Sequence, residues 1–159
     1  MNKNRLNEIE FHLKLLYEQK YDIETALILA SPGEQTRLRQ TIQIQISPQI
    51  GKYEEEYWQI IANQSNLGEI SESEAEVVVA EFVKGVGQLQ GENAEVIEYL
   101  QKILAKVEEP DSTAAAKLET VISSIPPFVG ISIKTELDIK NFLNRYFPTL
   151  MKAVQRLKK

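Results

Sequence analysis

Residues 6–30, LNEIEFHLKLLYEQKYDIETALILA, decide the fold of this chain. Apolar side chains recur here in alternating steps of three and four residues, which predicts a long helix with one apolar seam. The seam consists of Leu6, Ile9, Leu13, Leu16, Ile23, Leu27 and Ala30, with Lys20 at its one polar position. We expect a helix from about Lys3 to Ala30 that packs along its length against other helices.

A second apolar stripe follows after the turn-forming sequence Ser31-Pro32-Gly33-Glu34. Its members share one helical face and are Leu38, Ile42, Ile46, Ile50, Tyr53, Tyr57 and Ile60. Residues 41–47, TIQIQIS, also alternate as a half-buried strand would, and Pro48 should interrupt a helix. The stripe and its Glu-, Gln- and Arg-rich flanks favour a helix with a kink near Pro48. We therefore expect a long antiparallel helical hairpin.

The rest of the chain has the pattern of a second module with shorter helices. Residues 63–68, NQSNLG, are polar and turn-prone, which predicts a boundary between the hairpin at 1–64 and a small helical bundle at 70–159. Ser71 and Asp138 are good caps for helix amino termini. The expected core positions are Val79, Phe82, Val86, Leu89, Val96, Leu100, Ile103, Val107, Ile139, Leu143, Tyr146 and Leu150. The predicted fold class is all-α.

One segment of the second module does not fit a helix. Residues 125–130, IPPFVG, contain two consecutive prolines, and residues 131–134, ISIK, alternate in polarity. We expect no helix at 125–130 and a short extended segment near 129–134. The longest apolar stretches of the chain, 26–30 and 77–80, are interpreted as core because each spans only about one helical turn.

Composition excludes several functional classes. The 159 residues include 18 basic and 23 acidic side chains, and the net charge of -5 makes nucleic acid an unexpected partner. There is no cysteine, and the single histidine, His12, excludes zinc and di-iron sites that need two. No apolar run reaches the roughly 18 residues of a membrane span. Because the first ten residues lack the apolar block of a secretory signal, we expect a cytoplasmic protein without membrane contact.

Three short patterns have both a chemical and a structural interpretation. Residues 54–56, EEE, are a cation site or a solvated helix face. Residues 85–91, GVGQLQG, have two interpretations. The chemical one is a dinucleotide-binding loop whose third glycine is one place late, and the structural one is that the glycines allow close helix packing or end a helix. Glu136 and Asp138 are an acid and base pair or a helix cap. The structural interpretation is favoured each time, so no catalytic residue, cofactor or metal is expected.

An aromatic cluster at Tyr53, Tyr57 and Trp58 is the candidate interaction site. Tyrosine and tryptophan combine a large apolar area with a polar group, and they are enriched where one protein anchors on another. Tyr53 and Tyr57 fall on the core stripe, whereas Trp58 is turned by about 100° toward a second neighbour. That neighbour is either another protein chain or another part of this chain.

Two sets of residues resemble helical segments of cyanobacterial effector-associated proteins. The first set covers roughly the first 60 residues and comprises ALILASPGE at 26–34, RLR at 37–39 and YEEEYW at 53–58. The second set comprises SIPPF at 124–128, ELD at 136–138 and NFLNRYFP at 141–148, and is similar to segments that accompany switch nucleotidases, Toll-like receptor domains and caspase-like proteases in bacterial conflict systems. The resemblance implies an adaptor that recruits an effector, and it assigns no catalytic residue.

The sequence therefore predicts a non-enzymatic interaction module of a bacterial signalling or defence system. Recognition would occur through a helix face, with a protein partner or a second copy of the chain as the occupant. The alternative is a small ligand-binding or hydrolytic bundle with a pocket near residues Ile125 to Asp138.

Overall fold

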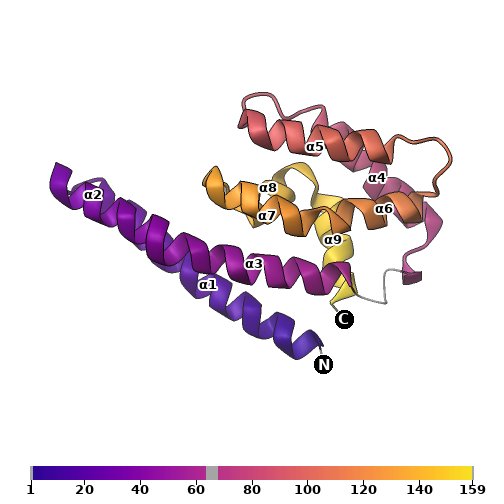
Figure 1. The fold of residues 1–159 in the computed structure, drawn as a ribbon. Helices are drawn as coiled ribbons and strands as arrows, with labels where there is room; N and C mark the ends of the chain where they lie inside the picture. The colour runs from indigo at the N-terminus through magenta and orange to yellow at the C-terminus, as the bar shows by residue number, and fades with distance from the viewer. Residues whose placement is uncertain (1, 64–67, 159) are drawn as a thin grey trace. The chain divides into compact units, whose positions relative to one another are not determined.

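The computed structural model describes residues 2–63 and 68–158, and all regular secondary structure among them is helical (Figure 1). The predicted all-α class is confirmed. In chain order the helices are α1 (Asn2–Leu27), α2 (Pro32–Thr41), the π-helix η1 (Ile42–Ile46), α3 (Ser47–Ala62), α4 (Glu72–Val86), α5 (Ala94–Val107), α6 (Ala114–Ser123), α7 (Ile125–Lys134), α8 (Ile139–Tyr146) and α9 (Pro148–Leu157).

The chain divides into two compact units, unit 1 at Met1–Tyr57 and unit 2 at Trp58–Lys159. The boundary between the two units falls within α3, between Tyr57 and Trp58. The predicted boundary at 63–68 consists mainly of residues 64–67, which lie outside the described residues. The predicted limits of 1–64 and 70–159 therefore stay a prediction.

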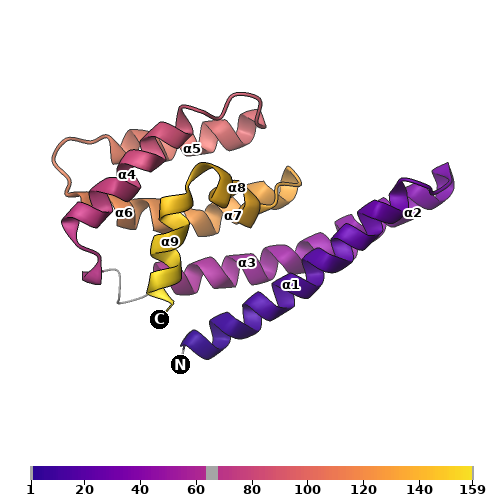
Figure 2. The same ribbon diagram turned by 180° about the vertical axis from the view of Figure 1, so that it is seen from behind.

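In unit 1, α1 lies alongside the α2, η1 and α3 segment, which runs in the opposite direction (Figures 1 and 2). Arg5 near the start of α1 contacts Glu56 in α3, whereas Gln35 in α2 contacts Leu27 at the end of α1. The seam residues Leu6, Ile9, Leu13 and Leu16 are buried, and so are Ile42, Ile46 and Ile50 across from α1. Toward the α1–α2 turn the seam is less covered: Lys20, Ile23 and Leu27 are only half-buried, and α2 has no buried residue.

The ambiguous segment before Pro48 is helical, with one widened turn. The Ser47 amide donates to the Ile42 carbonyl, five residues back, as in a π-helix. Pro48 has no amide hydrogen, and its ring would collide with the carbonyl four residues earlier in a regular α-helix, which accounts for a wider turn immediately before it. Ile42 and Ile46 are buried while Ile44 faces solvent, so the period-two pattern of the sequence does not reflect a strand.

The turn between α1 and α2 comprises residues 28–31, three residues earlier than expected. Ser31 is the cap of α2, and its hydroxyl accepts from the Glu34 amide at 3.4 Å. Pro32 is the first helical residue, a position where the missing amide hydrogen costs nothing. The Ser-Pro-Gly-Glu sequence therefore begins a helix, and the expectation that it forms the turn is wrong.

In unit 2, α4 packs against α5, α6, α8 and α9. Ser71 caps α4 by accepting from the Glu74 amide at 3.2 Å, as its spacing predicts. The expected core positions are buried apart from Val79 and Tyr146, which are half-buried. Unit 2 thus has a core of its own, centred on the apolar face of α4.

Two carboxylates of α4 cap the amino termini of other helices. Glu72 accepts from the Ala114 and Ala115 amides at 2.8 and 3.1 Å, at the start of α6. Glu81 accepts from the amide and hydroxyl of Thr149 at 2.7 and 2.6 Å, at the start of α9, where the preceding residue provides no side-chain cap. Both contacts satisfy amide groups that a helix leaves without an internal acceptor, and both place negative charge at the positive end of the helix dipole.

Residues 125–134 form helix α7, so the expected extended segment near 129–134 is wrong. Pro126 and Pro127 lie in its first turn, where the helix makes no internal bond to an amide hydrogen. Ile125, Phe128 and Val129 are buried on one helical face, and Ser132 donates to the Val129 carbonyl at 2.7 Å. A pair of prolines therefore begins this helix instead of preventing it.

Candidate interaction surface

The turn end of unit 1, defined as residues 18–44, exposes large apolar side chains. Leu29 is 93% exposed, Ile28 77%, Ile44 70% and Tyr21 69%. Ile28 and Leu29 are adjacent in the turn, and Tyr21 lies two helical turns before Ile28 on α1. Side chains of this size normally lose most of their exposure in a folded protein, and grouped exposed apolar residues mark interaction sites.

Hydrogen bonds on both sides hold the turn in place. Gln35 of α2 donates from Nε2 to the carbonyls of Leu27 and Ala30, each at 3.2 Å, and thereby supplies donors to the carboxyl end of α1. The Gln35 amide donates to the Ser31 carbonyl at 2.8 Å and begins α2. Ile28 and Leu29 are thus presented on a formed structure, which lowers the entropy lost when a partner binds.

These residues correct an expectation from the sequence. The sequence predicts that the apolar stretch 26–30 is core, yet Ile28 and Leu29 are among the most exposed side chains of the described chain. In the other such stretch, 77–80, Val78 is buried but Val77 is exposed. The sequence signal for the surface was present, since Tyr21, Ile28 and Leu29 lie outside the narrow seam of the first helix.

The predicted interaction residues are less accessible than the turn end. Trp58 is 2% exposed and lies in unit 2, and Tyr57 is buried in unit 1. Tyr53 is half-buried and stacks on His12 of α1, with ring centroids 5.1 Å apart. The burial of Trp58 favours the alternative in which its neighbours belong to this chain. The proposed role of the three residues as a partner anchor stays a prediction.

Burial also affects the chemistry of Tyr57. Removal of its phenol from water raises the pKa of Tyr57 above the ordinary value, and the carboxylates of Glu10 and Glu54 raise it further. Glu54 is itself buried and accepts a hydrogen bond from the Tyr17 hydroxyl at 3.0 Å. This part of unit 1 is therefore a polar layer between α1 and α3, with the phenol in its neutral form at physiological pH.

The three glutamates at 54–56 each lie in a different environment. Glu54 is buried beside Tyr17, and Glu55 is exposed. Glu56 accepts from Arg5 Nη2 at 2.7 Å, and this hydrogen bond lowers the pKa of Glu56. The solvated-face interpretation is therefore wrong for Glu54 and holds only in part for Glu56.

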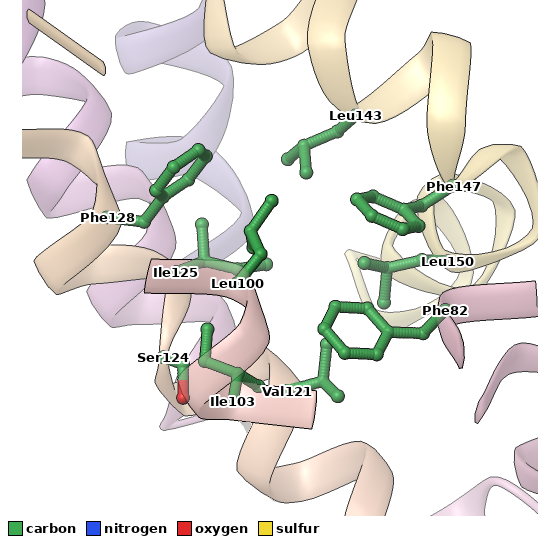
Figure 3. Close-up of a pocket in the computed structure, with 10 residues that line it drawn as sticks. All are labelled: Phe82, Leu100, Ile103, Val121, Ser124, Ile125, Phe128, Leu143, Phe147 and Leu150. Atoms are coloured by element: carbon green, nitrogen blue, oxygen red, sulfur yellow. The ribbon is translucent and has the colours of Figure 1, made fainter. Parts of the chain in front are cut away.

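The alternative prediction is a ligand pocket near residues Ile125 to Asp138. The structure has a cavity there, but it is small and almost entirely apolar. Ile125 and Phe128 line a cavity of about 10 Å³ in unit 2, together with Phe82, Leu100, Ile103, Val121, Ser124, Leu143, Phe147 and Leu150 (Figure 3). That volume is at the lower limit for one water molecule, whereas ligand pockets span about 300–1,000 Å³. Ser124 is the one polar residue in the lining, and its hydroxyl donates to the Thr120 carbonyl at 2.7 Å.

The two carboxylates of that region do not line the cavity. Asp138 caps α8, accepting from the Asn141 amide at 3.2 Å and from its side chain at 3.0 Å. Glu136 is exposed in the turn after α7, with a positive φ of 59°. The cap interpretation of Asp138 is confirmed, and the cavity that Ile125 and Phe128 line has no carboxylate in its lining to act as an acid or a base.

The glycine pattern 85–91 has structural roles. Gly85 lies in α4 against α8, where an added Cβ would be 2.6 Å from the Phe147 ring and 2.8 Å from the Tyr146 carbonyl oxygen. Gly87 ends α4, and Gly91 has a φ of +92° that glycine adopts without strain. Close packing and helix termination are therefore the observed roles of these glycines.

Within the described residues, no group of three or more acidic or histidine side chains is placed to hold a metal ion. In the same part of the chain, no helix combines the length and the apolar character needed to cross a bilayer. No family model matches this chain, and no curated protein or solved structure is significantly similar to it.

Proposed function

We propose that this chain is a non-enzymatic protein–protein interaction module that binds its partner through the turn end of unit 1. The observation that supports this most strongly is the exposure of Ile28 and Leu29, at 77% and 93%, on a turn fixed by hydrogen bonds. Burying each side chain against a partner contributes about 1.5–3 kcal/mol of favourable free energy. A surface of this kind suits recognition of an apolar helix face or groove.

The declining coverage of the seam supports the same surface. Leu6 and Ile9 are completely buried, whereas Ile23 and Leu27 are half-buried and α2 has no buried residue. The turn end therefore has apolar area that unit 1 itself does not cover. A protein partner that adds a helix there would complete the packing.

The biological setting is proposed from the resemblance of residues 26–34 and 37–39 to helical segments of effector-associated proteins. Those segments comprise the last two residues of α1, the α1–α2 turn and part of α2, so the resemblance and the exposed residues coincide. We infer an adaptor of a bacterial signalling or defence system that acts in the cytoplasm and recruits an effector by helix-face contact.

The test compares two variants of the full chain in the cells that produce it. Ile28→Ser with Leu29→Ser removes the apolar side chains of the turn, and Val77→Ser is the matched control, because Val77 is also an exposed aliphatic residue, in unit 2. We expect a partner to co-purify with the wild-type and Val77→Ser proteins but not with the double variant, while far-UV circular dichroism stays unchanged. Co-purification of the same partner with all three proteins would overturn the proposal.

A further inference from the structure

The second arm of the hairpin in unit 1, residues 32–57, departs from the repeat of α1 at one place. The seam of α1 alternates strictly between steps of three and four residues along one uninterrupted helix. The stripe of the second arm has steps of 4, 4, 4, 3 and 4 residues, and its members are Leu38, Ile42, Ile46, Ile50, Tyr53 and Tyr57. Removal of one residue between Ile42 and Ile46 would give 4, 3, 4, 3 and 4, and removal from any other interval would not give a strict alternation. The second arm therefore has one surplus residue between Ile42 and Ile46.

The π-helix of the structure lies in this same interval. η1 spans Ile42–Ile46, and the Ser47 amide donates to a carbonyl five residues back instead of four, so the turn holds one extra residue. In a regular α-helix the side chains of Ile42 and Ile50, eight residues apart, would differ in direction by about 80°. Both are nevertheless buried, with exposures of 7% and 1%. The widened turn thus returns the two halves of the stripe to one face.

The surplus residue is directed toward solvent. Residues 43–45 are all exposed, whereas Ile42 and Ile46 on either side of them are buried. Loss of one of the three exposed residues would therefore remove no buried side chain from the seam. Pro48 also disturbs the helix here, but a simple kink would relieve a proline equally well. The register of the stripe is an independent reason for a turn that holds one extra residue.

We propose that one of residues 43–45 is an insertion into a hairpin with an otherwise heptad repeat, and that η1 is the conformational device that absorbs it. By absorbing the insertion, η1 keeps the part of the stripe before it, at Leu38, in line with the part after it, at Ile50. The device therefore determines which face of α2 lies on α1. The inference is independent of the proposed function, because it concerns contacts inside unit 1.

The substitution Pro48→Ala separates the two causes, because it removes the proline and keeps the surplus residue. NMR measures scalar couplings across backbone hydrogen bonds, and these couplings identify the carbonyl that accepts from the Ser47 amide. We expect Ser47 to remain coupled to the Ile42 carbonyl in this variant, as in the wild type. A coupling to the Gln43 carbonyl instead, as in a regular α-helix, would overturn the inference.

Deletion of single residues tests the register directly, in the background of Pro48→Ala so that the resulting α-helix contains no proline. Deletion of Ile44 removes the surplus residue, and deletion of Lys52 is the matched control, because Lys52 is also exposed and lies in the same arm. Lys52 lies between Ile50 and Tyr53, in a step that holds no surplus residue. Its deletion should turn one part of the stripe by about 100° relative to the other and take buried side chains away from α1.

Hydrogen exchange of the α1 amides in the full chain is the readout, because it reports the opening of unit 1. Relative to Pro48→Ala alone, deletion of Ile44 should change the exchange rates of these amides by less than about threefold. Deletion of Lys52 should accelerate their exchange by at least about tenfold, since part of the apolar seam is lost. Equal exchange rates in the two deletion variants would overturn the inference.

Discussion

The substitution Gly85→Ala tests the packing of α4 against α8. An alanine Cβ at this position would lie 2.6 Å from the Cε1 atom of Phe147 and 2.8 Å from the Tyr146 carbonyl oxygen. Real Cβ atoms do not approach other heavy atoms so closely, and the backbone oxygen cannot move away by rotation of a side chain. The helix or the Phe147 ring must shift, and the phenylalanine stack of Phe147 on Phe82 shifts with it.

The size of the effect follows from two opposing contributions. Alanine is favoured over glycine within a helix by up to about 1 kcal/mol, and overpacking of a core costs about 1–3 kcal/mol. We take the upper end of that cost because one obstructing atom belongs to the backbone. Gly85→Ala should therefore lower the free energy of unfolding by about 2 kcal/mol.

Gly130→Ala is the matched control, because Gly130 lies within α7 and an added Cβ meets no heavy atom within 4 Å. It should raise the stability of unit 2 by about 0.5–1 kcal/mol. Urea unfolding followed by the fluorescence of Trp58, the single tryptophan of the chain, measures both variants. If Gly85→Ala is as stable as Gly130→Ala, the close approach of α4 and α8 is refuted.

Further changes act on a cap, a buried phenol and the exposed turn. Glu81→Gln should lower stability by about 1 kcal/mol, because it removes the charge that caps α9 at Thr149, whereas Glu76→Gln on the exposed side of α4 should change it by less than about 0.5 kcal/mol. Burial raises the pKa of Tyr57 in the folded state, so its contribution to the free energy of unfolding is complete below about pH 10. As the pH rises further, the free energy of unfolding declines by about 1.4 kcal/mol per pH unit. Leu29→Ala should leave the unfolding free energy of the isolated chain within about 0.5 kcal/mol of wild type, because the side chain is exposed.

Each of these expectations has a clear contradiction. If Glu81→Gln and Glu76→Gln lower the free energy of unfolding equally, Glu81 does not stabilise the protein by capping α9. Tyr57→Phe should remove the part of the alkaline decrease in unfolding free energy that comes from Tyr57. If the free energy of unfolding depends on pH identically in the wild type and the variant, Tyr57 ionises as easily in the folded state as in the unfolded state. A large loss in Leu29→Ala, measured by thermal unfolding, would place Leu29 in a core.

The helices with a single apolar face were predictable from the sequence. Capping residues such as Ser71 and Asp138 satisfy the first amides of their own helices, and this local chemistry is readable from spacing. The α5 stripe is buried as expected, where α5 packs against α4, α6 and α7. Where local and tertiary preferences agree, the sequence pattern is sufficient to predict a helix and its buried face.

The remaining features depend on context that the pattern does not contain. Pro126 and Pro127 are compatible with a helix only in its first turn, and the sequence alone does not show where that turn begins. The apolar stretch around Ile28 and Leu29 has the composition of a core, but no other part of unit 1 covers it. Conversely, Trp58 has the character of a partner anchor and is buried within the chain. Exposure is a tertiary property, so the position of Ile28 and Leu29 outside the narrow seam could not by itself distinguish a surface from contact with a second neighbour in the chain.

The central claim is that the turn end of unit 1 is an interaction surface, and photo-crosslinking from it is the most direct test. A photoreactive amino acid at position 29, activated in the cells that produce the chain, should give a covalent adduct with one defined protein or with a second copy. The same amino acid at position 102, an exposed site in α5, should give none. Absence of an adduct from position 29, or equal adducts from both positions, would contradict the claim.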